Sequence, residues 1–256
     1  MQHFRLYLPI LIILLFACNQ PDSDKKQAPA APSLPVQVEI TDLHYWMERG
    51  TFFVTGICNS RSDQWQKVWL RMEPLDKTGK PLQIGNLSGM EFPVFSAAIP
   101  PRGRSSFFQG WMLKDFSGRP DSCRVTGARA EAREAGPILL VEDLSTVRMQ
   151  SPGNDGTPGA ERGVQISGVL SNPLTINSEH PQLELLLYGT DNVLWLSTVL
   201  DPEDPALKNT LTMEGSGPLP AGGKRRFGTQ VTYGNLPQEL NNRKISRVEI
   251  LAFENR

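Results

Sequence analysis

The sequence is poor in the residues that most often carry chemistry. Its 256 residues include three histidines and three cysteines, and 26 Lys and Arg stand against 27 Asp and Glu. A chain so close to neutral lacks the basic surface of a nucleic-acid-binding protein. With 39% hydrophobic and 21% charged residues, it nevertheless has the composition of a folded protein. The 22 glycines and 21 prolines suit many turns between short strands.

The motifs of the common enzyme classes are also missing from the sequence. The string closest to a nucleophile elbow, residues 85–89, has the wrong spacing, and no glycine motif for dinucleotides or phosphates occurs. His44 and His180 lie in different halves of the chain, so a histidine-rich metal site would need the halves to meet. Residues 154–156 and 201–204 are either calcium loops or solvated turns. We therefore expect neither enzyme activity nor a cofactor.

The amino terminus carries a short apolar run at residues 7–16. A transmembrane helix needs about 20 apolar residues, whereas a secretory signal peptide needs a run of this length. The run ends in Leu15-Phe16-Ala17-Cys18, which resembles the bacterial lipobox. The resemblance implies that residues 1–17 are a signal peptide removed after Ala17. It also implies two modifications of Cys18. The thiol receives a lipid, and the amino group that cleavage exposes is acylated, as in palmitate-bearing lipoproteins.

The residues after Cys18 predict an anchor on a long tether. Asn19 differs from the aspartate of an inner-membrane retention signal, so the resemblance implies the outer membrane, on its periplasmic side or at the cell surface. Residues 18–35 contain four prolines and no hydrophobic period, and such a segment cannot bury enough surface to fold. We expect a disordered tether here.

The rest of the chain repeats one pattern twice. Each copy has an opening strand, a glycine-containing strand, an alternating strand, a Pro-Gly corner followed by phenylalanine, and a closing strand. The paired segments are 38–43 with 140–144, 52–59 with 164–172, 68–72 with 183–187, 99–107 with 219–227, and 123–126 with 246–249. The second copy is longer, which we attribute to extra loop at 151–162 and 201–217. Five pairs in one order indicate a tandem duplication.

The pattern within each copy predicts β-structure. Alternating apolar residues and frequent turn clusters are typical of strands, and about 100 residues per copy matches an immunoglobulin-like β-sandwich. We therefore predict an all-β fold with two tandem immunoglobulin-like β-sandwich domains, residues 36–134 and 137–256. Residues 127–135 have helix-forming composition, but they overlap the closing strand of the first copy. We interpret them as a strand that passes into a linker.

These segments also resemble a family of small bacterial modules, the FxLYD type. The shared features are a strand ending in Gly-x-x-x-Asn, an alternating strand that runs into Tyr-Asp, and a Pro-x-Gly-x-x-x-Phe corner. Here Leu75-Asp76 and Tyr188-Gly189 each match half of the Tyr-Asp pair. The resemblance implies sandwich modules of adhesive or scaffold proteins of the envelope, without catalytic residues.

Two cysteines remain besides Cys18. Cys58 shares its strand face with Phe52 and Val54, and Cys123 shares parity with Val125. A secreted protein meets oxidising conditions, so the two cysteines either form a disulfide or are separate buried thiols. The second copy has Leu170 and Ser246 at these places, so the fold itself does not require a bridge.

Tryptophans are the remaining candidates for a binding surface. Trp46, Trp65 and Trp69 all lie in the first copy, and Trp65 and Trp69 fall on the strand face opposite Val68 and Leu70. They are either an exposed contact for a partner or are covered by the other domain or a loop.

We therefore expect a noncatalytic envelope lipoprotein. It would be held by the lipid bilayer through acylated Cys18 and would act in contact with, or assembly of, other envelope proteins. The alternative is a module that binds envelope glycan or lipid through the aromatic residues of the first copy. No nucleic-acid partner is expected.

Overall fold

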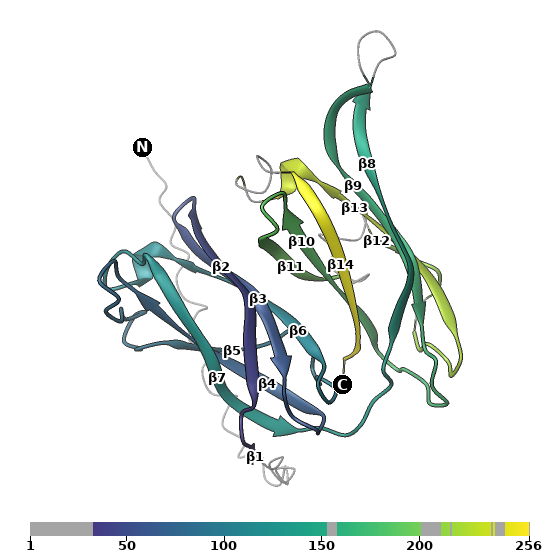
Figure 1. Cartoon of the computed structure of the whole chain (residues 1–256), viewed down its shortest axis with the longest axis horizontal. Coiled ribbons are helices and arrows are strands. Elements are labelled where there is room, and N and C mark those ends of the chain that lie inside the picture. Colours follow the sequence, from purple (N-terminus) through teal and green to yellow (C-terminus); the bar gives the residue numbers. More distant parts are fainter. Residues whose placement is uncertain are drawn as a thin grey trace, which may run out of the picture. The chain divides into compact units, whose positions relative to one another are not determined.

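The computed structural model describes residues 33–152, 158–200, 211–215, 217–236, 238 and 244–255, and residues 32–256 form one compact unit. Antiparallel strands make up most of this chain, as Figure 1 shows, so the all-β prediction is confirmed. The predicted signal peptide, Cys18 and the segments 154–156 and 201–204 lie outside the described residues.

The first copy consists of two antiparallel sheets. The strand order is β1-β7-β4-β5 in one sheet and β2-β3-β6 in the other. The 3₁₀ turn η1 (Leu113–Asp115) follows β6 along the chain. The strands are β1 (Ser33–Leu34), β2 (Val38–Glu48), β3 (Thr51–Ser60), β4 (Gln66–Leu75), β5 (Met90–Pro93), β6 (Arg104–Met112) and β7 (Ser122–Ala132).

The second copy repeats this strand order, except that β1 has no counterpart in it and β12 has no counterpart in the first copy. Its sheets are β11-β10-β14 and β12-β13-β9-β8, with the 3₁₀ turn η2 (Tyr233–Asn235) after β13 as η1 follows β6. The strands are β8 (Leu140–Pro152), β9 (Pro158–Ser171), β10 (Pro181–Gly189), β11 (Leu194–Leu200), β12 (Leu211–Met213), β13 (Lys224–Thr232) and β14 (Ile245–Glu254). All five predicted pairs of segments therefore fall on equivalent strands.

The repeat extends to local irregularities of the backbone. The β2–β3 pairing shifts register after Thr41, and the β8–β9 pairing shifts after Glu142. At these bulges Asp42 and Asp143 have φ of 50° and 52°, a left-handed conformation that aspartate tolerates better than most residues. A bulge with the same residue at the same place in both copies supports the duplication.

A glycine and a phenylalanine fix the packing of each sandwich. A Cβ at Gly56 would lie 2.6 Å from the ring of Phe107, and one at Gly168 would lie 2.8 Å from the ring of Phe227. Both rings are buried, at 0% and 3% exposed. The two rings therefore occupy space that only glycine leaves on the neighbouring strand.

Each sandwich has its own apolar core between its two sheets. The first core contains the predicted inward residues of β3, β4 and β7, including Val54, Leu70 and Val125. The second contains those of β9, β10 and β13, including Ile166, Leu185 and Phe227. Alternation along the strands thus fills both cores, as predicted.

The end of the predicted tether is wrong. Residues 18–35 include β1, which pairs antiparallel with β7 through Ser33 with Glu131 and Leu34 with Ala130. Val36, two residues after β1, packs against Gly127. A Cβ at Gly127 would lie only 2.1 Å from the Val36 side chain. The missing side chain of Gly127 makes room for the incoming chain.

Two further sequence interpretations have definite outcomes. β7 continues through residues 127–132, so the alanine-rich segment is strand, as predicted. Residues 151–162 are not simply loop, because β8 and β9 extend through Pro152 and from Pro158 onward. Tertiary pairing into a long hairpin takes precedence there over the turn-forming composition.

The disulfide alternative for Cys58 and Cys123 is wrong, because both are free, buried thiols. Cys58 lies near the beginning of β4. Ser60, two residues further along β3, accepts a hydrogen bond of 2.8 Å from the side chain of Gln66, the first residue of β4. Cys123 is paired with Pro74 near the end of β4. With about 3.3 Å per strand residue the two levels differ by on the order of 20 Å, whereas a disulfide needs Cα atoms within about 7 Å. Burial raises both thiol pKa values to about 12.

The contact between glycine and phenylalanine predicts the effect of a single methyl group. Gly56→Ala and Gly168→Ala should each lower the free energy of unfolding by about 1–3 kcal/mol, because the added Cβ overlaps a ring in a closed core. Gly234→Ala is the matched control, since a Cβ there meets no atom within 4 Å. Urea unfolding checks this, and equal stability of all three variants would contradict it.

Candidate functional site

The two sandwiches meet through the outer faces of two sheets. Leu186 and Tyr188 of β10 point away from their own core and form an apolar cluster with Leu194 of β11 and Ile57 of β3. Consequently β10 is buried on both faces, and seven consecutive residues, 183–189, are buried. This docking interface lies outside the first core, and through Trp46 of the first copy it is continuous with the second core.

Trp46 lies in this interface and is 7% exposed. Its ring stacks on Phe53 at a centroid distance of 5.2 Å and meets Trp195 edge-on at 5.4 Å. The prediction that Trp46 contacts an external partner is therefore wrong, because the second sandwich covers it. Aromatic pairs of this kind add to the stability of an interface beyond the area they bury.

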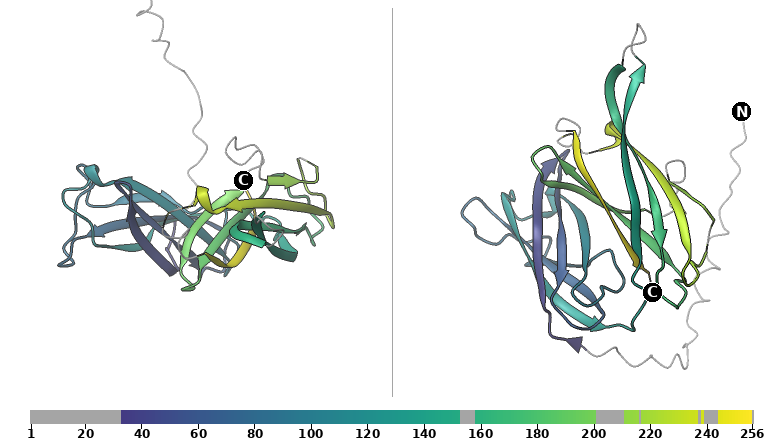
Figure 2. Two further views of the ribbon diagram at one scale, coloured as in Figure 1. Left: turned by 90° about the horizontal axis from the view of Figure 1, so that it is seen from above. Right: turned by 45° about the vertical axis from the view of Figure 1, so that its right-hand side comes forward.

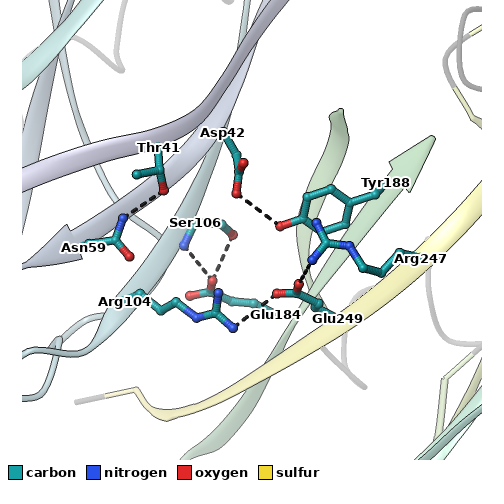
Figure 3. A network of polar contacts seen from close by, with 9 residues as sticks. All are labelled: Thr41, Asp42, Asn59, Arg104, Ser106, Glu184, Tyr188, Arg247 and Glu249. Atoms are coloured by element: carbon teal, nitrogen blue, oxygen red, sulfur yellow. Dashed lines mark hydrogen bonds and ion pairs between the residues drawn. The ribbon is translucent and has the colours of Figure 1, made fainter. Parts of the chain in front are cut away.

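Glu184 carries a buried carboxylate across the docking interface, as Figure 3 shows. Its side chain comes from β10, and its three hydrogen-bond donors all come from β6. Ser105 Oγ donates at 2.6 Å, while the backbone N–H and Oγ of Ser106 each donate at 2.8 Å. The carboxylate satisfies a backbone N–H at the edge of the sheet β2-β3-β6. It therefore ties the second sandwich to the edge strand of the first.

Burial controls the ionisation of Glu184. Desolvation raises the pKa of its carboxyl group from 4.5 to about 7, although the bonds from Ser105 and Ser106 and the charge of Arg104 act in the opposite direction. Arg104 itself pairs with Glu249 at 3.2 Å rather than with Glu184. The interface thus holds a carboxyl group with hydroxyl and amide donors but without a cation in contact.

A rim of polar contacts surrounds this carboxylate (Figure 3). The guanidinium of Arg247 lies 3.6 Å above the ring of Tyr188. The Tyr188 hydroxyl reaches Asp42 at 3.5 Å, and burial raises its pKa to about 12. Arg247 also pairs with Glu249. These contacts join β10 and β14 of the second copy to the bulge of β2 in the first.

The arrangement is suited to holding the two sandwiches together. Ser105 and Ser106 are fully buried, and Glu184 is 1% exposed. Within the described ranges no group of three or more His, Cys, Asp and Glu side chains could hold a metal ion. We interpret the Glu184 cluster as an interdomain clasp.

The other two predicted contact tryptophans lie on or near the outer face of β4. Trp69 is half-buried: the guanidinium of Arg129 lies 3.6 Å from its ring centroid, and the Lys67 ammonium lies 5.0 Å away. Trp65 is half-buried too, and its carbonyl accepts from the N–H of Arg133 at 2.9 Å. The structure therefore does not gather Trp46, Trp65 and Trp69 into one surface.

An edge strand that the sequence did not single out is far more exposed. β8 lies at the end of the sheet β12-β13-β9-β8, so among the described strands only β9 pairs with it. Leu144 is 39% exposed and Val147 is 59% exposed. β8 and β9 form a hairpin that projects beyond the neighbouring strands (Figure 2). Long edges with apolar side chains are sites where further strands can pair.

Glu161 fixes the base of this hairpin. Its carboxylate accepts two bonds from Arg148 Nη1, at 2.9 and 2.8 Å, and one from the Tyr233 hydroxyl. The Glu161 side chain is 10% exposed. Burial acts to raise the pKa of its carboxyl group, but the pKa is lowered overall by the bonds from Tyr233 and Arg148 and by the charge of Lys244. A largely buried carboxylate on β9 and a half-exposed guanidinium on β8 therefore link the two strands of the hairpin.

The sequence held signals for both features. Glu184 is the single charge in the run Leu183–Tyr188, and a charge within a strand that is apolar on both faces indicates a paired, buried group. The extra residues of the second copy marked the hairpin, although they indicated loop. Which strand lies at an edge depends on sheet order, and a single sequence does not contain that order.

The fold and its surfaces define a tandem β-sandwich protein with an internal docking interface. No protein-family model matches the chain, and no curated protein matches it. A red sea bream transglutaminase crystal structure is similar to 85% of this chain at 10% identity, with a TM-score of 0.22, and the chain spans 30% of that structure's length. Among the residues described, no helix is long and apolar enough to cross a membrane.

Glu184 predicts an unusual dependence of stability on pH. Its folded pKa of about 7 lies above its ordinary value of 4.5, so the folded state binds the proton more tightly. The resulting stabilisation is complete below about pH 4.5 and is lost as the pH rises through 7. The difference amounts to about 3 kcal/mol, since one pKa unit corresponds to about 1.4 kcal/mol.

Urea unfolding of the wild type and of Glu184→Gln at pH 5 and pH 8 isolates this contribution. The wild type should lose about 2 kcal/mol or slightly more relative to the variant between these two pH values, since the unfolded carboxyl group is already mostly ionised at pH 5. Subtracting the variant removes the opposite contribution of Glu142 and Glu161, whose pKa values are lowered. An unchanged difference between the two proteins would contradict the buried, raised-pKa carboxyl group.

Proposed function

We propose that this chain is a noncatalytic envelope lipoprotein that binds a protein partner by adding a strand to the edge of β8. The carrying observation is that edge: a 13-residue strand, Leu140–Pro152, paired on one side among the described strands. Its unpaired backbone groups supply affinity in such pairing, and its exposed side chains supply specificity.

The second copy departs from the first at this hairpin. The offset between equivalent residues is 101 at Asp42 and Asp143 but 112 at Gly56 and Gly168, so 11 residues are inserted between them. In the first copy β2 and β3 are joined by Arg49 and Gly50 alone. A sandwich needs no such extension, because the first copy is complete without it. The insertion therefore supports a role outside folding.

The mixed character of β8 suits a reversible partner. Leu144 and Val147 are apolar, while Glu142 and Arg148 are held in ion pairs with Lys224 and Glu161. The bulge at Asp143 interrupts the strand near its beginning. Bulges and charges limit indiscriminate pairing along an edge, and the segment after the bulge remains for a specific strand.

The lipid anchor rests on the lipobox at Cys18. Two acyl chains hold a protein stably in a bilayer, whereas one does so only marginally. Fourteen residues, 19–32, separate Cys18 from Ser33, where β1 begins. A chain of this length reaches at most about 50 Å, which keeps the folded part near the outer membrane and leaves β8 free to meet other envelope proteins.

The alternative, a glycan- or lipid-binding module built on tryptophans, has weaker support. Stacking on a sugar requires an open ring face, but Trp46 is buried and Trp69 is covered by Arg129 and Lys67. Trp65 and Trp111 are the partly open tryptophan rings that remain in the first copy, and Trp111 packs against Phe92. We therefore favour the partner strand.

The anchor predicts the fate of the chain after Cys18→Ser. The variant should lose incorporation of labelled palmitate and should leave the membrane fraction or accumulate unprocessed, because the acylated thiol is gone. Fractionation with metabolic labelling measures both effects. A processed Cys18→Ser chain that stays in the membrane fraction to the wild-type extent would exclude the lipid anchor.

The edge of β8 predicts which substitutions abolish partner binding. Leu144→Lys with Val147→Lys should reduce recovery of cross-linked envelope proteins by about tenfold, because lysines on an edge oppose strand addition. Leu87→Lys is the matched control, since Leu87 is 54% exposed and lies outside every strand. Mass spectrometry after cross-linking measures recovery, and urea unfolding verifies that all three proteins fold equally.

If the double variant recovers the same proteins as the wild type, the edge of β8 is not the binding site. Loss of the same proteins from the Leu87→Lys control would contradict the assignment as well, because it would show a response to charge alone.

A further inference from the structure

One end of the folded unit gathers the beginning of the described chain, the linker between the copies and a loop of the second copy. β1 pairs with the last residues of β7, and after β7 ends at Ala132 the chain runs to Leu140, where β8 begins. Leu140 is paired with Ser171, the last residue of β9. We call this the proximal end, because the chain enters the fold here.

Four large aliphatic side chains are exposed at the proximal end. Ile138 and Leu140 are 48% and 45% exposed, and they flank Leu139, which is buried in the second core. Leu174 and Ile176 are 38% and 45% exposed. They lie on the loop after Ser171, which Asn172 closes by donating to the carbonyl of Ile176 at 2.8 Å. We call these four residues the proximal patch.

The fold does not require apolar residues at these positions, as the first copy demonstrates. In the first copy the N–H of Ser60 donates to the carbonyl of Gly103, and Gln66 pairs with Ile99. In the second copy the N–H of Asn172 donates to the carbonyl of Gly223, and Ser178 pairs with Leu219. These anchors, with the bulges, align the two copies residue by residue. The positions equivalent to Ile138, Leu140, Leu174 and Ile176 are Gln37, Glu39, Ser62 and Gln64.

We propose that the proximal patch contacts the lipid surface to which Cys18 anchors the chain; this inference rests on the proposed function. The tether joins the fold at β1, at the same end as the patch, and the fourteen residues between Cys18 and Ser33 let the chain reach at most about 50 Å. The proximal end is therefore the part of the fold that the anchor keeps nearest to the bilayer.

The chemistry of the proximal end suits the interface of a bilayer. Exposed aliphatic side chains gain free energy on entering the acyl boundary. Trp65, on the equivalent loop of the first copy, is half-buried, and tryptophan favours the headgroup level. The nearby cations Arg61, Arg102 and Lys224 are paired with Glu39, Asp63 and Glu142. Binding should therefore be mainly hydrophobic and should persist at high salt.

The test uses the mature chain, residues 18–256, with Cys18→Ser, so that no acyl chain contributes. Flotation with vesicles of phosphatidylethanolamine and phosphatidylglycerol measures the bound fraction. The comparison protein carries Ile138→Gln, Leu140→Gln, Leu174→Ser and Ile176→Gln, which are polar like the first copy. The wild-type patch should bind, and the quadruple variant should bind at least about tenfold less.

Leu87→Gln with Met112→Gln is the matched control, because it removes exposed apolar side chains that lie outside both the proximal patch and the edge of β8, and it should bind like the wild-type patch. Absence of vesicle binding, or equal binding of the quadruple variant, would overturn the proposal and leave the Cys18 fractionation result untouched. Patch-dependent self-association in sedimentation, without vesicle binding, would also overturn it in favour of a second copy. Vesicle binding by a chain that cells do not acylate would support the patch and exclude the anchor.

Discussion

The structure depends on the burial of one sheet face against another between the two copies. The outer face of β10 and β11 would be an exposed apolar surface if the second sandwich stood alone, and Trp46 and Ile57 would be exposed on the first. Apolar contact supplies the attraction, but it has no direction of its own. Glu184 and Ser197 supply direction, because the Glu184 carboxylate accepts three bonds from Ser105 and Ser106 and the Ser197 hydroxyl donates to the carbonyl of Phe107. A buried carboxyl group of this kind is costly wherever it is not fully bonded.

The two copies share a fold, yet their outer faces have diverged in opposite directions. Residue by residue, Trp46 and Phe53 in the interface correspond to the exposed Val147 and Gln165 of the second copy. On the other sheet, Glu184, Leu186 and Tyr188 in the interface correspond to Trp69, Arg71 and Glu73, which face outward in the first copy among ion pairs. Core positions thus specify the sandwich, while the outward positions of the same strands specify what it touches.

Much of this architecture could be predicted from sequence, because alternation reports which residues of a strand face inward. The inward set Val68, Leu70 and Met72 is buried, and so is Leu183, Leu185 and Leu187. The outward residues were harder, because their burial depends on a neighbour that periodicity does not reveal. Trp46 and Trp69 look alike in the sequence, yet one is covered by a sandwich and the other by Arg129 and Lys67. The exposed edge of β8 and the free state of Cys58 and Cys123 depend on sheet order and strand direction, which alternation leaves undetermined.

The docking of unlike faces has a consequence for assembly. The face used by the first copy differs from the face used by the second, so the contact is heterologous, and a heterologous contact repeated without closure generates a filament. Here the two faces that would continue the series carry Gln165 and Ser167 at one end and Lys67, Arg71 and Glu73 at the other. These polar and charged residues, which share the two faces with Val147 and Trp69, resemble the polar outer faces of the capping units that end repeat arrays.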